Sequence, residues 1–168
     1  MTARAHPQFK LRPYLPQDAP LLADIFRASV EQLTEDDYNP AQQEAWASEV
    51  DELEALAERL GQHLTLVAML DGSPVGFISL DAATEIGLFY VHPAVAGRGV
   101  GAMLYDAVEK LAMSRGISHL TVDASDTARE FFARRGFTAE QRNTISIGNE
   151  WLSNTTMKKQ LAKKERAP

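Results

Sequence analysis

The stretch Thr84–Ala112, TEIGLFYVHPAVAGRGVGAMLYDAVEKLA, predicts a strand, a glycine-rich turn and a helix in direct succession. A β-rich apolar run ends at His92-Pro93, and the cluster Gly97-Arg98-Gly99-Val100-Gly101 follows it. Apolar residues then recur at helical spacing, at Val100, Met103, Leu104, Ala107, Val108 and Leu111. Since the N–H groups of such a turn and helix start lack backbone partners, this segment is a candidate site for a phosphate-bearing cofactor.

The residues before this unit predict one strand followed by helices. Phe9–Tyr14 reads as a short strand, and Asp18 stands where the N-cap of a helix is expected. Pro40 marks the first turn of a second helix. A third helical segment runs through about Asp51–Leu60 and stops at Gly61.

The rest of the chain predicts strands around two helices. A hairpin with an Asp-Gly turn precedes the strand of the opening stretch, so three consecutive strands are expected to be antiparallel neighbours. The order predicts an α/β fold whose mixed central sheet has an antiparallel N-terminal part, one βαβ unit and a C-terminal hairpin, flanked by helices. Besides the glycine turn and its helix, the predicted elements are the strands Leu64–Leu70, Pro74–Leu80, Glu85–Val91 and Ile117–Ala124, the helix Thr127–Arg135, and a hairpin of Phe137–Ile147 with Glu150–Lys159.

The composition predicts a single domain over residues 1–168. With 168 residues and 45% apolar content, the chain can bury a sizeable core. Because there is no cysteine, disulfides, thiolate metal sites and a cysteine-bound acyl intermediate are excluded, and the scattered histidines predict no metal site. The longest apolar run, Leu64–Leu70, is too short to span a bilayer, and the N-terminus lacks a secretory apolar region, so we expect a cytoplasmic protein with no membrane partner.

The charge of the chain is unevenly distributed. Ten acidic residues and no Lys or Arg lie between Glu31 and Glu58, while about 158–168 form a basic tail that we expect to be partly frayed. With a net charge of −6, the chain is a poor candidate for a nucleic-acid partner. The acidic segment has two interpretations, the solvated faces of helices or a surface that attracts a cationic ligand.

Two common phosphate-binding motifs fit the glycine turn poorly. No Lys-Ser/Thr pair follows the last glycine, which excludes a Walker-type loop. Gly97-x-Gly99-x-x-Ala102 matches the dinucleotide fingerprint, and Asp123 lies near the place of its ribose-binding acid. However, five residues including a proline separate Val91 from Gly97, and a second mononucleotide-binding half is missing. A nicotinamide or flavin cofactor is therefore disfavoured.

The chain resembles the GCN5-related N-acetyltransferase (GNAT) superfamily over nearly its whole length. The family signature [Q/R]-x-x-G-x-[G/A] is matched by Ala96–Gly101, with Ala96 where Gln or Arg is usual. A second block, A-x-x-F-[YF]-x-x-x-G-F, is matched by Ala128–Phe137. Asp123–Phe132 and Leu152–Leu161 further resemble a bacterial subfamily with D-A-S-x-x-A-R-x-F-F and L-x-N-x-x-M-x-K-x-L motifs.

The resemblance implies that the chain uses acetyl-CoA. In this family the pyrophosphate rests on backbone N–H groups of the glycine turn and helix start, and glycines allow its close approach. The strand Leu88–Val91 would splay from its neighbour and offer main-chain groups to the pantetheine arm. The implied cofactor-binding residues are Phe89, Tyr90, Val91, His92, Gly97, Arg98, Gly99, Val100, Gly101, Ala102, Ser125, Phe131 and Phe132.

The implied reaction is acetyl transfer to a primary amine of a small molecule or peptide, by direct attack in a ternary complex. Deprotonating an alkylammonium at pH 7 requires roughly 4–5 kcal/mol, so a base is expected. Glu85 occupies the place of the catalytic glutamate of several family members, in the pattern E-I-x-x-x-x-[VI], with a plain exposed charge as the alternative. His92 titrates in the right range but is expected to lie beside the cofactor.

The general acid is open on the sequence alone. The family commonly has a tyrosine at the position of Phe132, so that hydroxyl is absent. Ser125 either supplies a hydroxyl to the cofactor or caps the next helix. Tyr38 and Tyr90 are possible substitutes, and nothing in the sequence selects between them.

The acceptor site is expected between the N-terminal helices and the last hairpin. Tyr38 and Trp46 are candidate acceptor contacts, with packing as the alternative role. If the acidic segment takes part, the acceptor is a cationic amine. A non-catalytic acyl-CoA-binding sensor is the alternative function, and a homodimer is possible because dimers are common in the family.

Overall fold

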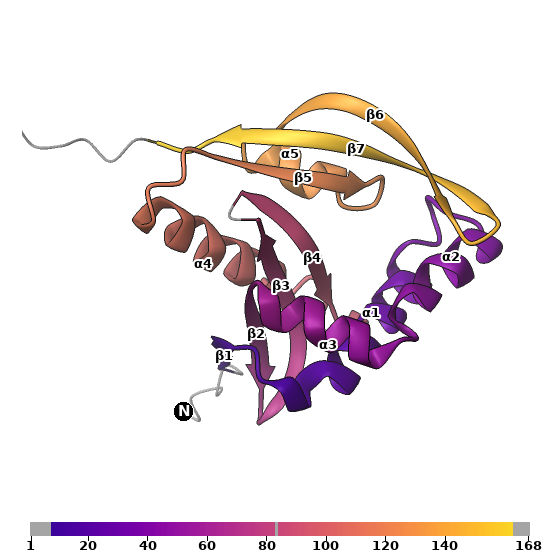
Figure 1. Ribbon diagram of the computed structural model, residues 1–168, viewed down its shortest axis with the longest axis horizontal. Helices are drawn as coiled ribbons and strands as arrows, with labels where there is room; N and C mark the ends of the chain where they lie inside the picture. Colours follow the sequence, from indigo (N-terminus) through magenta and orange to yellow (C-terminus); the bar gives the residue numbers. More distant parts are fainter. Residues whose placement is uncertain (1–7, 83, 163–168) are drawn as a thin grey trace, which may run out of the picture.

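A seven-stranded mixed sheet forms the centre of the computed structural model, which describes residues 8–82 and 84–162 (Figure 1). The strand order is β1-β2-β3-β4-β5-β7-β6, and every neighbouring pair is antiparallel except β4 and β5. The predicted α/β architecture is therefore confirmed. The strands are β1 Phe9–Pro13, β2 Leu64–Leu70, β3 Ser73–Asp81, β4 Glu85–Val91, β5 His119–Ser125, β6 Thr138–Ile147 and β7 Glu150–Gln160.

Helices cover both faces of the sheet, because alternate strand residues point to opposite sides. On one face Val67 and Phe77 pack with apolar residues of α1, α2 and α3, and on the other Ile78 packs against α4. The apolar stripe predicted for α4 is confirmed, since Leu104 and Val108 are fully buried. The helices are α1 Ala19–Leu33, α2 Pro40–Ala47, α3 Leu53–Gln62, α4 Val100–Ser114 and α5 Arg129–Arg134, with short 3-10 turns η1 Pro16–Asp18, η2 Ser48–Val50 and η3 Pro93–Val95.

One N-terminal prediction holds in part and one was wrong. Asp18 is at the N-cap position of α1, as predicted, but its side chain does not cap that helix, because its carboxylate accepts two hydrogen bonds from Arg12 and one from the Leu15 N–H. The helix α3 does not stop at Gly61, which is part of it. The Thr65 hydroxyl donates to the Leu60 carbonyl at 2.9 Å and so satisfies one of the last acceptors of α3 from outside it.

Two C-terminal predictions also needed correction. The helix expected from Thr127 begins at Arg129, because the Ala128 N–H bonds back to Ser125 and shapes a turn first. The tail expected to fray from about residue 158 is ordered strand up to Gln160, and the Lys159 ammonium lies 3.0 Å from the Glu109 carboxylate. The remaining basic residues, 163–168, lie outside the described residues.

The sheet is nearly interrupted between β4 and β5. Their parallel pairing consists of Glu85 with Thr121 and Ile86 with Val122. A bulge in β4 follows at once, where the pairing with β3 shifts and the Leu88 N–H donates to the Ser79 hydroxyl at 2.9 Å. Beyond it the two strands diverge, as Figure 1 shows. The splay predicted for residues 88–91 is thereby confirmed.

The buried Arg12–Asp18 pair predicts an acid-sensitive contribution to stability. Hydrogen bonds from Arg12, opposed by burial, hold the pKa of Asp18 below its usual 3.8. A carboxyl with a lowered folded pKa stabilises the fold above its unfolded pKa, and this contribution is lost as pH falls through the folded pKa. We expect Asp18→Asn to lower the free energy of unfolding by about 2–4 kcal/mol at pH 7, an effect that starts to shrink below about pH 4 and is lost below the folded pKa.

Urea unfolding at several pH values measures this difference. Asp24→Asn is the matched control, because the Asp24 side chain is 73% exposed in its 3.4 Å pair with Arg27. Its loss should change the unfolding free energy by under about 0.5 kcal/mol. A difference between wild type and Asp18→Asn that stays constant with pH would contradict the assignment.

Candidate functional site

A cavity of about 510 Å³ occupies the opening between β4 and β5. Its walls come from elements far apart in the chain. The helical N-terminal region (α1, η2 and α3) forms one side, and the β6–β7 hairpin forms the other. Because β4 and β5 part after two residue pairs, the backbone of both strands borders the cavity. A cavity is therefore present where the acceptor site is expected, between the N-terminal helices and the last hairpin.

The glycine turn presents unpaired backbone N–H groups at the start of α4. Gly97 and Gly99 have φ values of 76° and 84°, a left-handed conformation that other residues adopt only with strain. The first helical hydrogen bond runs from the Met103 N–H to the Gly99 carbonyl, so the three preceding N–H groups, of residues 100–102, have no partner within the helix. The Arg98 N–H is already donated to the Val95 carbonyl. This geometry suits an anionic phosphate at the helix start.

Three phenylalanines form an apolar wall between the glycine turn and the cavity. The ring of Phe89 lies 5.4 Å from that of Phe131 and 6.0 Å from that of Phe132, measured between centroids. Phe132 is 2% exposed and lines the cavity together with Phe89. A side chain at Gly101 would touch Phe89 and Phe131. The absence of a tyrosine hydroxyl at Phe132 thus leaves this wall of the cavity apolar.

His92 and Ser125 both engage in local hydrogen bonds. The Nδ1 atom of His92 accepts from the Ala94 N–H at 3.0 Å, so this nitrogen is not available as a base. The Ser125 hydroxyl accepts from the Ala128 N–H at 3.1 Å while lining the cavity. The alternative predicted for Ser125, capping of the next helix, was wrong, because Ala128 is at the N-cap position of α5 and Ser125 instead shapes the turn before it. Its hydroxyl proton can still be donated.

Tyr38 connects the N-terminal helices to the C-terminal half of the sheet. Its hydroxyl donates to the Ser153 carbonyl at 2.8 Å and accepts from the Asp126 N–H at 2.9 Å. Thr127 donates a further hydrogen bond to Asp37. Burial raises the pKa of Tyr38. Its ring lines the cavity, but its hydroxyl proton is used structurally.

Trp46 and Tyr90 contact each other on the wall of the cavity. The indole N–H of Trp46 donates to the Tyr90 hydroxyl at 3.2 Å, and the two rings meet edge to face. Burial raises the pKa of Tyr90, so it stays protonated at neutral pH. Since its hydroxyl oxygen accepts from Trp46, its own proton is free to point elsewhere.

The charged residues of the cavity were not individually predicted from the sequence. Glu49 of η2 and Arg59 of α3 both line it. The Glu49 side chain keeps solvent contact, yet neighbouring protein atoms desolvate its carboxyl and raise its pKa, while Arg59 acts in the opposite direction. Glu85, the predicted base, is exposed at the first position of β4 and lies outside the cavity lining.

Asp81 and Gly87 support this charged region. Arg59 donates to the Asp81 carboxylate at 3.2 Å, and that carboxylate lies directly against the backbone of Gly87. A Cβ atom at position 87 would lie 2.1 Å from the Asp81 Oδ2 atom. A glycine inside a strand pattern is the sequence signal for such a close approach, and here it marks the point where β4 leaves β5.

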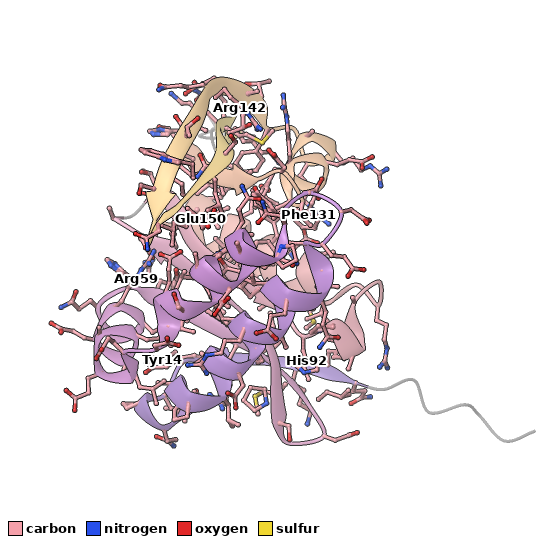
Figure 2. The ribbon with its side chains drawn as sticks, turned by 90° about the vertical axis from the view of Figure 1, so that its right-hand side faces the viewer. Tyr14, Arg59, His92, Phe131, Arg142 and Glu150 are labelled. Carbon is pink, nitrogen blue, oxygen red and sulfur yellow. The ribbon has the colours of Figure 1, made fainter. Side chains whose placement is uncertain are left out.

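In Figure 2, Arg59 and Glu150 appear to the left of His92 and Phe131. Within residues 8–82 and 84–162, no group of three or more His, Asp or Glu side chains is arranged to hold a metal, and no helix is long and apolar enough to cross a membrane.

Comparisons with known proteins agree on one family. The family model for the acetyltransferase (GNAT) domain matches residues 34–161. The N-acetyltransferase YafP of Escherichia coli K12 is 34% identical over 89% of this chain and 94% of its own length. A GCN5-related N-acetyltransferase structure from Rhodopseudomonas palustris is 57% identical, covers 96% of this chain and 99% of its own, and superposes with a TM-score of 0.89. The PaiA N-acetyltransferase of Thermoplasma acidophilum, solved with coenzyme A, shares the fold at 21% identity and a TM-score of 0.75, over 91% of this chain and 99% of its own.

The Tyr38 hydroxyl predicts a stability effect. Tyr38→Phe removes two hydrogen bonds across the opening of the sheet and leaves the Asp126 N–H and the Ser153 carbonyl without that partner. We expect the free energy of unfolding to fall by about 1–3 kcal/mol in urea titrations. Tyr14→Phe is the control, since the Tyr14 hydroxyl makes a single 3.5 Å contact, and equal effects of the two changes would refute the assigned role.

The close approach at Gly87 predicts a coupled pair of substitutions. In Gly87→Ala the added methyl group would overlap the Asp81 carboxylate and force it away from the backbone of residue 87 and from Arg59. This should destabilise the fold by about 1–3 kcal/mol. In an Asp81→Ala background the obstructing carboxylate is gone, so the same change should have an effect under about 0.5 kcal/mol. A double-mutant cycle by urea unfolding tests this, and additive effects would show that the two residues are not in contact.

Proposed function

Because the chain belongs to the GNAT family of N-acetyltransferases, which use acetyl-CoA, we propose that it acetylates a cationic primary amine by direct attack in a ternary complex. The observation that carries this proposal is the cavity between β4 and β5, whose walls contain Glu49 and Trp46. Phe89 belongs to the same lining and lies against Gly101 at the start of α4. The acceptor is a small molecule or peptide amine. With no cysteine in the chain, a cysteine-bound acyl intermediate is not available.

The side of the cavity next to the glycine turn is proposed to hold acetyl-CoA, which supplies the acetyl group as a thioester. The unpaired N–H groups of residues 100–102 would bind its pyrophosphate, and the unpaired edge of β4 at residues 88–91 would accompany its pantetheine arm. Phe89, Phe131 and Phe132 supply the apolar surface beside that edge. The residues predicted for cofactor binding lie on β4, on the segment from His92 to the start of α4, and on the β5–α5 segment.

The other side of the cavity is proposed to select a cation. Glu49 and Asp123 line it, and the charge of its one lining cation within the described residues, Arg59, is largely offset by Asp81. The aromatic faces of Trp46 and Tyr90 add a further attraction for an ammonium group. Of the acidic segment Glu31–Glu58, the residue that lines the cavity is Glu49.

For the acid that protonates the leaving thiolate, Tyr90 is the stronger of the two tyrosines. The Tyr38 hydroxyl donates its proton to a carbonyl, whereas the Tyr90 hydroxyl accepts from Trp46 and keeps its own proton for a group in the cavity. A thiolate also leaves adequately without an acid. The missing tyrosine at Phe132 is the observation that supports the alternative, a sensor that binds acyl-CoA without turnover.

Release of free thiol from acetyl-CoA tests the proposed function. Spermidine, kanamycin, lysine amide and phenethylamine serve as cationic acceptors, and aniline as an acceptor that is neutral at pH 7. We expect acceptor-dependent release with the cationic amines. Binding of acetyl-CoA with no release on any of these amines would favour the sensor.

The glycine turn gives a matched pair of variants for the cofactor side. Gly99 and Gly116 have φ values of 84° and 74°, and at both positions a Cβ would meet open space. Alanine at either should reduce stability by about 1–2 kcal/mol, because both are left-handed. Gly99→Ala should also raise KM for acetyl-CoA by about tenfold, since it disturbs the N–H groups at the start of α4, and Gly116→Ala should not. Equal KM values for the two variants would place the cofactor elsewhere.

A further inference from the structure

Of the ten acidic residues between Glu31 and Glu58, Glu49 is the one that lines the cavity, and all ten lie in the described part of the chain. It belongs to the short η2 turn, which the neighbouring Val50 anchors in the core at 3% exposure. The Val50 carbonyl also accepts a hydrogen bond from Arg27 of α1. The backbone that carries Glu49 is therefore fixed, while its carboxyl reaches the cavity.

The Glu49 carboxylate has no ion-pair partner among the described residues, although an arginine lines the same cavity. Arg59 is engaged by Asp81 instead, at 3.2 Å. The Asp81 carboxylate is seated against Gly87, where only a glycine leaves room for it, and its Oδ1 atom is buried without a hydrogen-bond partner. Arg59 is thus paired with Asp81, and Glu49, which has no ion pair among the described residues, is left to receive a cation.

We propose that Glu49 is the catalytic base, the carboxylate that takes a proton from the bound ammonium, and that the Arg59–Asp81 pair is the positioning element that keeps it free and ionised. This assignment rests on the proposed acetyltransferase function and replaces Glu85 in that role. Glu85 is exposed, pairs in register with Asp81 at the start of β4, and lies outside the cavity lining.

The proton transfer balances as follows. A Glu49 oxygen accepts one proton from the ammonium, which frees the nitrogen lone pair. The amine nitrogen forms a bond to the thioester carbonyl carbon, and the carbon–sulfur bond breaks. The nitrogen, now cationic, loses a second proton, and the departing thiolate gains one. In the proposed mechanism the Tyr90 hydroxyl protonates the thiolate and regains its proton from the nitrogen. Glu49 finally returns its proton to solvent, so the net products are the amide, the free thiol and one proton.

The electrostatic surroundings of Glu49 suit a base at neutral pH. Desolvation raises the pKa of its carboxyl and makes it a stronger proton acceptor, while Arg59 limits the rise and so keeps it ionised. The other titratable groups on the cavity walls are Tyr38, Tyr90 and Asp123, and Asp81 faces Arg59. Both tyrosines are neutral at pH 7, so Arg59 is the charge that opposes the desolvation of Glu49.

Steady-state kinetics with phenethylamine and spermidine, from about pH 5 to about pH 9, test the proposal. We expect Glu49→Gln to lower kcat by about a hundredfold or more and to remove the acid limb of the kcat profile. KM for the amine should rise by a smaller factor, because the carboxylate also attracts the cation. Arg59→Gln should move that acid limb to higher pH, because it removes the opposing positive charge. Glu44→Gln, on the exposed surface of α2, is the control that should leave all three quantities unchanged.

A second measurement needs no acceptor. The carboxyl of Glu49, followed by NMR in protein labelled with ¹³C-glutamate and identified by its absence in Glu49→Gln, should titrate at higher pH in Arg59→Gln than in the wild type. Equal urea midpoints for the wild type and Glu49→Gln show that the exposed substitution leaves the fold intact.

The outcomes separate the two levels of the proposal. A wild-type protein that releases no thiol with any amine overturns the proposed function and the base with it. An active wild type whose Glu49→Gln variant keeps its rate and its acid limb overturns Glu49 alone. Loss of rate and of the acid limb in Glu85→Gln, with Glu49→Gln active, returns the role to Glu85. A large rise in KM with unchanged kcat in Glu49→Gln shows a binding carboxylate and not a base.

Discussion

The parallel contact between β4 and β5 holds for two residue pairs only, and the rest of the site depends on this break. A continuous sheet would pair every backbone group of the two strands and leave no room between them. Here the bulge after Ile86 turns β4 away, so its edge borders a cavity of about 510 Å³. Such an opening weakens the sheet at its centre. The Tyr38 hydroxyl compensates by joining the N-terminal helices to β7 and to the β5–α5 turn.

The regions on the two sides of this break attract ligands of opposite charge. On one side, the start of α4 offers N–H groups without helical partners, a site for anions. On the other, Glu49 and the aromatic pair Trp46 and Tyr90 offer a site for cations. In the proposed reaction, an anionic cofactor and a cationic acceptor would meet at this opening, as direct transfer in a ternary complex requires.

Much of the fold was predictable because it depends on local patterns. The strand Glu85–Val91 and the buried stripe of α4 were placed correctly by period and by turn residues. The errors lie where a contact between elements outcompetes a local signal. Asp18 is at an N-cap position, yet Arg12 of β1 binds its carboxylate. Lys159 is strand because it pairs with β5 and its ammonium contacts Glu109 of α4. No local pattern reports which side chains of two elements will meet.

By itself, the sequence determined the order of the elements, the glycine turn with its family signature, and the absence of cysteine chemistry, since each depends on residue type and near spacing. Only the tertiary structure decided which polar groups share the cavity. Three residues of separate elements line it where β4 turns away from β5, namely Glu49, Arg59 and Gly87. Asp81, from a fourth element, lies against Gly87. The tertiary structure also placed Glu85 outside that cavity. Side-chain proximity between distant segments follows from how elements pack, and residue spacing does not encode it.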